Sequence, residues 1–586
     1  MKPATVYSAD APKGAWAARA TLDANAPDGE LLRIDGGSGP VLSLRRDGTQ
    51  LRLTFHTQWN GAEGRFKKGQ LFDFTLETPF AAGEWRSEWL NYAVRMYANG
   101  RLTDEEWPLG ALPDGQWRVK HGAGITGFSF DAPSATTDDA ETSMYGPMQF
   151  FRPPGHNTGA GDCMPFSRDG RYCLYYLFDR RGHRSKAGLG AHQWAQISSG
   201  DLKHWTVHPM AVGITEEWEG SICTGSLIKK DGRTYAFYAV RAADGSPARL
   251  THAVSPDGVR YTKSHDSLAL TAPYEPVSAR DPMVFWGADG RYHMLVTTSL
   301  ETKGRHDGCL AHLTSDDLAH WTQRDPFLVP GYADQPECSD YFEWRGWYYL
   351  VFSNYGTARY RLSRNPFGPW IKPANDVLGS LGVRVAKTAD FHGRRLVSGF
   401  LCRHPPTYAG CIVTHELCQH ADGTLGVKWA EEILPAAIRR VLVPEVDIQA
   451  PQGRNETPLY RGAPRFRLRA NLAPSGDHSL YGLSLRFAAG REYRLDFDPA
   501  RNLVQALRPN QDADGGEKHC QLAGIAGLDN PTGIDLMVYD DILDVVLSGG
   551  RALTLRLEPE TGECELHAYA MWGGLKAATA TLEELG

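Results

Sequence analysis

The chain has 586 residues, with 62 basic and 69 acidic side chains and a formal net charge of −7 at pH 7. At roughly 100–250 residues a domain, this length predicts two or three domains. Because there is no excess of basic residues, the chain lacks the attraction to phosphates on which binding to nucleic acids and anionic membranes depends. We therefore exclude both as partners and expect a neutral small molecule or polymer.

The first residues predict a cytoplasmic protein. Residues 1–20 lack the apolar segment of a secretory signal, and no window reaches the about 18 consecutive apolar residues of a membrane helix. The ten cysteines are scattered and form no C-x-x-C pair. They are typical of reduced thiols, because structural zinc and small disulfide frameworks need closely spaced cysteines.

The first domain is predicted at 1–135 as a β-sandwich of lectin or laminin-G type. Strand-like runs occur at 51–59 and 92–108, and the Asn99-Gly100 pair is typical of a tight hairpin turn. The polar stretch 132–143 predicts the linker to the next domain.

Five turn-and-strand repeats follow this linker, each with a glycine-containing turn before an aromatic and β-branched run. They lie at 167–179, 229–240, 287–298, 343–354 and 391–401. A spacing of roughly 50–60 residues suits four-stranded propeller blades with longer loops. We therefore predict a five-bladed β-propeller at 140–432, with an ordinary β-sandwich as the alternative.

The last domain is predicted at 446–586. Segments of alternating apolar and polar residues fill this region, and the pattern is typical of a second β-sandwich. The whole chain is therefore predicted to be all-β, with a central propeller between two sandwiches.

Three carboxylates fall at about the same distance ahead of their repeat turns. Asp162, Asp281 and Glu337 belong to the first, third and fourth repeats. The inner strands of propeller blades line a common axis, so equivalent positions in different repeats converge in space. The sequence therefore predicts one funnel lined by three acids.

Clustered acids of this kind suit the cleavage of glycosidic bonds. Mutual repulsion raises at least one pKa, so one site can hold an ionised and a protonated carboxyl group at neutral pH. In glycoside hydrolysis the carboxylate attacks or stabilises the sugar centre, while the carboxylic acid protonates the leaving oxygen. A single acid would be read as a turn or surface residue, but three at one place favour catalysis.

Several ordered motifs resemble those of glycoside hydrolase family 32. They are GDCMPF at 161–166, WAQISSGDLKHW at 194–205, CTGS at 223–226, ARDPMVF at 279–285 and PECSDYF at 336–342. The resemblance covers about 145–586 and leaves the first domain outside it. It implies a five-bladed propeller followed by a β-sandwich, and a retaining hydrolase that acts on small or polymeric β-fructosides.

The same resemblance implies roles for four residues. Asp162 would be the nucleophile, Asp281 would stabilise the transition state through sugar hydroxyls, and Glu337 would be the general acid and then base. Arg280 would donate to a hydroxyl group beside Asp281. No metal or organic cofactor is implied, since two carboxyl groups suffice for the reaction.

The first motif departs from the family pattern, which affects the expected substrate contacts. Gly161 stands where the family has an asparagine, and Leu177 stands where it has a glutamine. We therefore expect other side chains to bind the substrate. The candidates are Gln193, Trp194, Trp218, Glu219, Thr224 and Cys338. Trp194 and Trp218 suit packing and sugar stacking equally well.

Three other functions stay open on the sequence. The same scaffold could transfer fructosyl groups to a sugar, or it could be an inverting furanosidase of the family 43 type. A propeller that binds carbohydrate without catalysis is the third, and the altered first motif favours it. The oligomeric state is left open.

Overall fold

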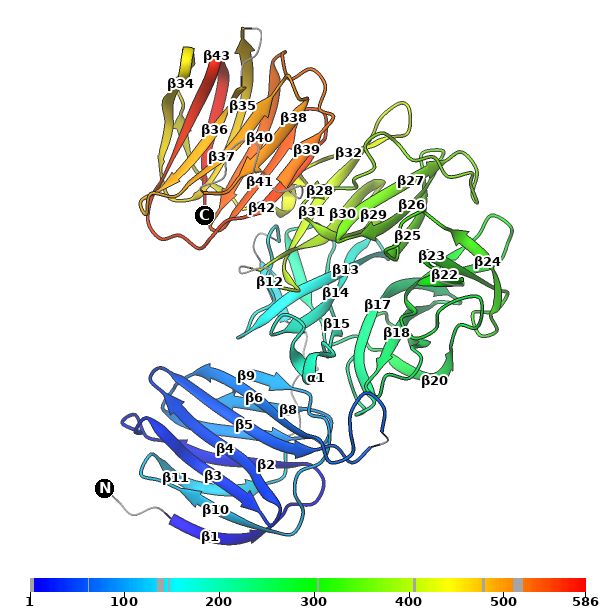
Figure 1. Cartoon of the computed structure of the whole chain (residues 1–586), viewed down its shortest axis with the longest axis vertical. Helices are drawn as coiled ribbons and strands as arrows, with labels where there is room; N and C mark the ends of the chain where they lie inside the picture. Colours follow the sequence, from blue (N-terminus) through cyan, green and yellow to red (C-terminus); the bar gives the residue numbers. More distant parts are fainter. Residues whose placement is uncertain are drawn as a thin grey trace.

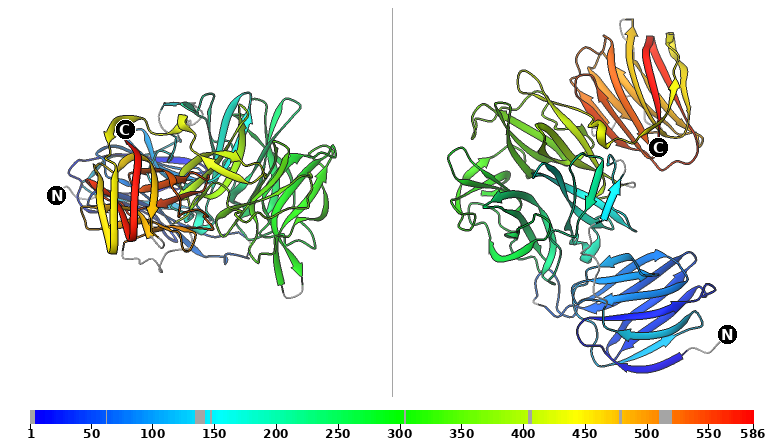
Figure 2. Two further views of the ribbon diagram at one scale, coloured as in Figure 1. Left: turned by 90° about the horizontal axis from the view of Figure 1, so that it is seen from above. Right: turned by 180° about the vertical axis from the view of Figure 1, so that it is seen from behind.

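The computed structural model describes residues 5–61, 63–133, 142–145, 148–302, 305–403, 407–476, 480–509 and 520–586. Within these ranges the chain is almost wholly β-strand, and its helical turns are α1 (Ser185–Gly188) and a 3-10 helix at Glu431–Ile433. Figure 1 shows a central propeller with a sandwich at each end of the chain, and this confirms the predicted all-β architecture. Both sandwiches lie on one side of the propeller, as the view from behind also shows (Figure 2).

The amino-terminal sandwich consists of a six-stranded and a five-stranded sheet. The first sheet runs in the order β1 (Thr5–Asp10), β10 (Gln116–His121), β3 (Gly29–Gly36), β4 (Gly39–Asp47), β5 (Gln50–Gln58) and β6 (Leu71–Pro79). The second runs in the order β11 (Ile125–Asp131), β2 (Trp16–Leu22), β7 (Gly83–Trp89), β8 (Val94–Ala98) and β9 (Arg101–Glu106). The predicted turn at Asn99-Gly100 joins β8 to β9, and both residues have positive φ, 49° and 77°. Residues 134–141 of the predicted linker lie outside the described residues.

The propeller has five blades. Blade one contains β13 (Thr158–Arg168), β14 (Arg171–Arg180), β15 (Gln193–Ser199) and β16 (His204–Val207), with β12 (Thr142–Tyr145) added at its outer edge. Blade two contains β17 (Glu219–Lys230), β18 (Arg233–Ala242), β19 (Arg249–Ser255) and β20 (Thr262–Leu268). Blade three contains β21 (Arg280–Trp286), β22 (Tyr292–Thr302), β23 (Arg305–Ser315) and β24 (Thr322–Leu328). Blade four contains β25 (Glu337–Trp344), β26 (Trp347–Asn354) and β27 (Thr357–Ser363), and blade five contains β29 (Arg384–Phe391), β30 (Arg394–Cys402), β31 (Gly410–Gln419) and β32 (Leu425–Lys428).

The glycine-containing turns of the repeats join the first two strands of each blade. In four blades both turn residues have positive φ, which is the backbone of a type I′ turn and explains the glycine. These pairs are Asp169-Gly170, Asp231-Gly232, Arg345-Gly346 and His392-Gly393. The repeats therefore mark the hairpins that carry the inner strands.

The ring closes between blades one and five. Ala160 of β13 pairs with Gly410 of β31, so the two blades share one sheet. Ile412 then receives a hydrogen bond from the backbone of Phe150 and donates one to Phe151, at 2.9 Å each. The beginning and the end of the propeller sequence thus meet beside the inner strand of blade one.

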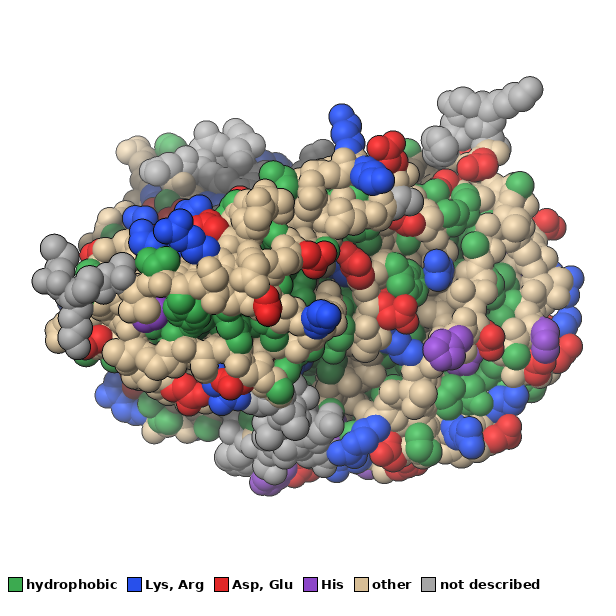
Figure 3. Space-filling view, turned by 90° about the horizontal axis from the view of Figure 1, so that it is seen from below, with side chains coloured by type: hydrophobic (Ala, Val, Ile, Leu, Met, Phe, Trp, Pro, Cys, Tyr) green, Lys and Arg blue, Asp and Glu red, His purple; other side chains and the backbone are tan. Residues whose placement is uncertain are grey.

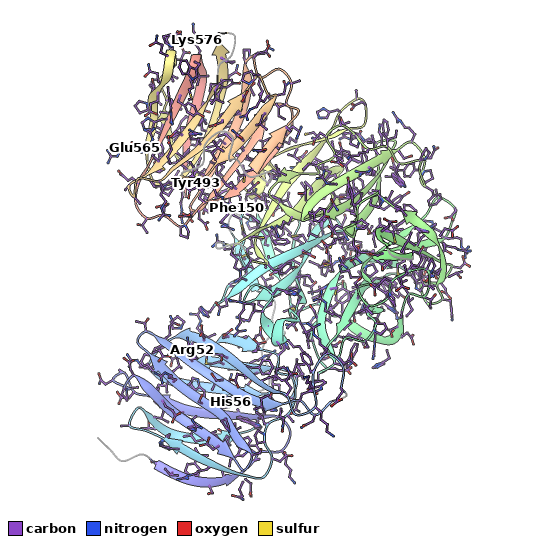
Figure 4. The ribbon with its side chains drawn as sticks, viewed as in Figure 1. Arg52, His56, Phe150, Tyr493, Glu565 and Lys576 are labelled. Atoms are coloured by element: carbon purple, nitrogen blue, oxygen red, sulfur yellow. The ribbon has the colours of Figure 1, made fainter. Side chains whose placement is uncertain are left out.

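The carboxyl-terminal sandwich is built around one long strand, β43 (Cys564–Leu585), which pairs with four others. Those four are β33 (Ala437–Leu442), β34 (Val446–Gly462), β35 (Arg465–Ser475) and β36 (Leu480–Phe487). The remaining strands are β37 (Glu492–Asp498), β38 (Leu503–Leu507), β39 (Gln521–Ala523), β40 (Thr532–Tyr539), β41 (Ile542–Leu547) and β42 (Ala552–Arg556), and β42 also pairs with β28 (Ser380–Leu381). Phe150 marks the junction with the propeller in Figure 4, where its ring stacks on Tyr539 at 6.0 Å between centroids.

The amino-terminal sandwich is attached to blade one by buried ion pairs. Strand β9 ends in three acids, Asp104, Glu105 and Glu106. Arg181, which directly follows β14, pairs with Asp104 and, at 3.2 Å, with Glu106. The neighbouring Arg180 pairs with Glu105 at 3.1 Å. The Asp104 side chain is fully buried, and burial raises its pKa against the effect of the two arginines. The sandwich is therefore docked on the propeller.

The face of the molecule seen from below and the described helices bear on the partners that the sequence excluded. Basic and acidic side chains are interspersed on the face seen from below (Figure 3). Among the described residues, no helix is long and apolar enough to cross a membrane. In the same part of the chain, no group of three or more His, Cys, Asp and Glu side chains is placed to hold a metal ion.

Candidate active site

Each inner strand of the propeller carries a β-bulge at the same place. The pairing with the second strand skips two residues in β13, β17, β21, β25 and β29. The skipped pairs are Gly161-Asp162, Cys223-Thr224, Asp281-Pro282, Cys338-Ser339 and Val385-Ala386. Bulges re-aim side chains and are common beside active sites. Here they bring functional groups from different blades to one place.

The three acids occupy neighbouring positions around these bulges. Asp162 is the second bulge residue of its blade, Asp281 is the first of its own, and Glu337 immediately precedes the bulge of blade four. The expectation that all three share one position is therefore wrong in detail. Counting back from the turns misplaces Glu337, because the stretch between bulge and turn is one residue shorter in blade four than in blade one.

A continuous chain of contacts links the three acids. The Cys338 thiol lies 3.4 Å from Asp162 Oδ2, and the Cys338 backbone N–H donates to Asp281 Oδ2 at 3.2 Å. Arg280 lies 3.6 Å from Asp281 and donates to Glu337 Oε1 at 2.8 Å. The structure thus brings together five of the predicted site residues, from blades one, three and four.

Asp162 is held by hydroxyl groups from two other blades. Thr224 of blade two donates to Asp162 Oδ2 at 2.5 Å, and Tyr408 donates to Oδ1 at 2.9 Å. Burial raises the pKa of Asp162, while the Thr224 and Tyr408 hydroxyls lower it and the Glu337 charge raises it. Only 8% of Asp162 is exposed, so these donors are what stabilise its carboxylate.

Glu337 is the most accessible of the three acids. Its side chain is 34% exposed, whereas Asp281 is 3% exposed. Burial raises the pKa of Glu337, and Arg280 partly opposes that rise. The pKa of Asp281 is also raised by burial, against the attraction of Arg280. Glu337 therefore combines an elevated pKa with access to solvent.

The local backbone of two site residues is left-handed. Asp281 has a φ of 56° and Cys338 has a φ of 52°. This conformation places the Cys338 N–H against Asp281 and its thiol against Asp162. Residues held at positive φ cost about 1–3 kcal/mol and cluster at active sites.

Four other predicted site residues lie in structural contacts instead. Trp194 is fully buried between Tyr175 and Tyr238, and its indole N–H donates to Cys223 O at 2.8 Å, so it packs and does not stack on a sugar. Gln193 is buried and accepts a hydrogen bond from the Ile214 backbone at 2.8 Å.

Trp218 and Glu219 are likewise occupied away from the acids. The guanidinium of Arg249 lies 4.1 Å from the Trp218 ring, whose N–H donates to Glu216 at 2.6 Å. Glu219 is 2% exposed, pairs with Lys263 at 2.5 Å and accepts the Thr215 N–H at 2.7 Å. Both residues therefore organise the loop that enters β17.

Comparison with known proteins agrees with this geometry. The family model described as "Glycosyl hydrolases family 32 N-terminal domain" matches residues 164–367. The raffinose invertase of Escherichia coli is 23% identical over 451 residues, which cover 71% of this chain and 90% of that protein. The sucrose-6-phosphate hydrolase of E. coli is 24% identical and covers the same shares. The sucrose-6-phosphate hydrolase of Bacillus subtilis is 28% identical over 181 residues, and this chain spans only 37% of its length.

Residues 164–367 thus match a glycoside hydrolase family 32 domain, and the relatives over the longer range support the same family. The chain is therefore a glycoside hydrolase. The match to the family model contains Asp281 and Glu337 and begins two residues after Asp162.

Solved structures show that the fold is shared along the chain. A family 32 glycoside hydrolase from Bifidobacterium adolescentis superposes with a TM-score of 0.59 at 16% identity and covers 99% of both chains. Fructan 1-exohydrolase IIa from Cichorium intybus superposes with a TM-score of 0.55 at 14% identity, over 77% of this chain and 98% of its own. The first of these likenesses includes the amino-terminal sandwich.

Tyr408 is the site residue that sequence reasoning missed. A Cβ atom on Gly161 would lie within 3 Å of the Tyr408 ring and hydroxyl, so the tyrosine fills the space that an asparagine would need. The ring stacks on His192 at 4.6 Å between centroids. Tyr408 lies between β30 and β31 of blade five and shares no motif with Asp162, so only the glycine signalled that a neighbour comes close.

Proposed function

We propose that the protein is a retaining β-fructofuranosidase that forms a covalent fructosyl-enzyme intermediate. The observation that carries this proposal is the contact chain from Asp162 to Glu337, which joins a buried, hydroxyl-bound carboxylate to an accessible acid of raised pKa. Relatives named as an invertase and as sucrose-6-phosphate hydrolases support a fructoside as the substrate.

In the first step, the Asp162 carboxylate attacks the anomeric carbon of the fructosyl unit. Glu337 gives its proton to the glycosidic oxygen as that bond breaks, so the aglycone leaves as a neutral alcohol. Asp281 accepts hydrogen bonds from sugar hydroxyls, and Arg280 fixes Asp281 and Glu337 relative to each other. The product of this step is an ester between Asp162 and the sugar.

In the second step, Glu337 is ionised and takes a proton from water. The resulting oxygen attacks the anomeric carbon and releases Asp162 as a carboxylate, and Glu337 regains its proton. The thiol and hydroxyls around Asp162 donate hydrogen bonds to the carboxylate that is re-formed. Two inversions give net retention of configuration.

The stereochemical outcome tests this proposal directly. With sucrose as substrate, proton NMR in the first minutes of turnover should show β-fructofuranose before mutarotation. Initial release of the inverted anomer would contradict the nucleophile role of Asp162 and move the protein to an inverting mechanism. Absence of fructose release from sucrose, raffinose and inulin alike would contradict the substrate class.

Two variants separate the roles of the acids. Asp162→Asn and Glu337→Gln should each lose roughly 10²–10⁴-fold or more in turnover of sucrose. Glu337→Ala should keep more activity than Asp162→Ala on a fructoside with an activated leaving group, because that group needs no protonation. Glu343→Gln, on the exposed outer part of the same strand β25, is the matched control and should keep its activity.

A further inference from the structure

A cavity lies at the end of the amino-terminal sandwich, where it meets the propeller. Its volume is about 490 Å³, which falls within the roughly 300–1,000 Å³ that small-molecule sites occupy. Four indole rings line it, those of Trp16, Trp59, Trp89 and Trp117. We call it the tryptophan cavity. None of the three acids of the candidate active site lines this cavity.

Two of these indoles offer unused hydrogen-bond donors. Trp16 is 3% exposed and Trp89 is 6% exposed, and they face each other across the β2–β7 pair. Among the described residues neither indole N–H has an acceptor, and neither is enclosed in the protein as the Trp85 N–H is. The Trp117 N–H, in contrast, donates to Pro113 O at 2.8 Å. Nearly buried donors that open into a cavity are groups that a ligand can satisfy.

The rim of the cavity adds amide and carboxylate oxygens, which accept hydrogen bonds. Asn60, Asn91 and Asp114 are exposed there, and Glu217 comes from the propeller. Glu217 Oε1 accepts the Gly110 N–H at 2.7 Å, which fixes its carboxylate at the edge. No lysine or arginine belongs to the described lining. This lining disfavours an anionic ligand, and its groups suit a ligand that carries both hydrogen-bond donors and acceptors.

We propose that the tryptophan cavity binds one or two units of a neutral oligosaccharide. Sugar hydroxyls accept from the indole N–H groups and donate to Asp114 and Glu217, and the apolar C–H faces of the sugar pack on the indole rings. The site is separate from the catalytic acids. Because Glu217 belongs to the propeller, the ligand bridges the two domains.

Calorimetric titration of the full-length Asp162→Asn protein tests this inference without turnover. The probes are neutral tri- to pentasaccharides of the inulin, levan, malto, cello and xylo series. Asp114→Ala, a change on the exposed rim, should weaken one probe series by roughly tenfold, the effect of losing a hydrogen bond to a charged group. Any binding that Asp114→Ala leaves unchanged arises outside the tryptophan cavity.

Trp89→Phe is the second variant, because it keeps an aromatic ring and removes only the N–H and part of the ring. It should weaken the same probe series, whereas Trp85→Phe, the same change in the same strand, should not. The proposal is overturned if no probe series loses affinity in Asp114→Ala, or if Trp85→Phe lowers affinity as much as Trp89→Phe. Since the readout is binding, this result is independent of which glycoside the enzyme cleaves.

Discussion

The hydroxyl of Tyr408 controls the ionisation of Asp162 from one side. Because this donor lowers the pKa of a buried carboxyl group, Tyr408→Phe should raise that pKa further. In the proposed mechanism Asp162 must be ionised to attack, so the acid limb of the kcat/KM profile should move to higher pH. Activity near neutral pH should fall while the basic limb stays in place.

Steady-state kinetics between pH 4 and pH 9 would measure this shift. Tyr261→Phe is the control, because its hydroxyl bonds to Tyr175 and not to an acid of the site. An acid limb that does not move in Tyr408→Phe would show that this hydroxyl leaves the nucleophile unaffected.

Arg280 should govern the opposite limb. Its charge lowers the pKa of Glu337, so Arg280→Gln should raise that pKa and keep the general acid protonated to higher pH. We expect the basic limb of kcat/KM to extend upward, together with a lower maximum because Asp281 and Glu337 lose their common anchor. A basic limb that falls to lower pH would contradict the assignment of Glu337 as the acid.

At the scale of the strand, the bulge of β21 makes a prediction about stability. Asp281 has a left-handed backbone, which costs alanine more than asparagine. Both Asp281→Asn and Asp281→Ala remove the same charge, so their difference reports the backbone together with the side-chain acceptor for the Cys338 N–H, which only asparagine keeps. Asp281→Ala should be less stable by about 1 kcal/mol in denaturant unfolding. Equal stability would show that the bulge relaxes without cost.

The strands also show how far the sequence could predict the fold and the site. The glycine turns are local, so the five hairpins and the all-β class followed from the pattern. The stretch between the bulge and the turn is one residue shorter in blade four than in blade one, and the spacing of the repeats did not reveal this difference. Tyr408 meets Asp162 across 246 positions of sequence, and such contacts arise only from ring closure. Trp194 looked equally suited to stacking and packing until its burial was known.

For the whole molecule, the docking of the amino-terminal sandwich is open to test. Asp104→Asn removes one buried carboxylate from Arg180 and Arg181, which keep Glu105 and Glu106, and breaking a buried pair typically costs about 3–5 kcal/mol. We expect a lower midpoint of thermal unfolding and faster proteolysis between the sandwich and the propeller. Arg45→Gln, which breaks an exposed pair with Asp47, should change stability little.

From the sequence we predicted a sandwich joined to the propeller by a polar linker. Nothing in the sequence indicated that the sandwich is fixed against the propeller. The acids of β9 and the arginines of β14 are each ordinary surface residues by pattern, and only their meeting makes them an interface. An unchanged unfolding midpoint in Asp104→Asn would show that the remaining ion pairs and the apolar contacts, those of Trp107 among them, suffice to hold the sandwich.

The closure of the ring also bears on synthesis of the protein. A growing chain leaves the ribosome from its amino terminus, so Asp162 emerges long before Tyr408 and the strand that pairs with Ala160. A nascent chain that ends within blade four carries all three acids, yet its Asp162 lacks one of its two hydroxyl donors. The full set of contacts around Asp162 is thus assembled only when the propeller sequence is almost finished.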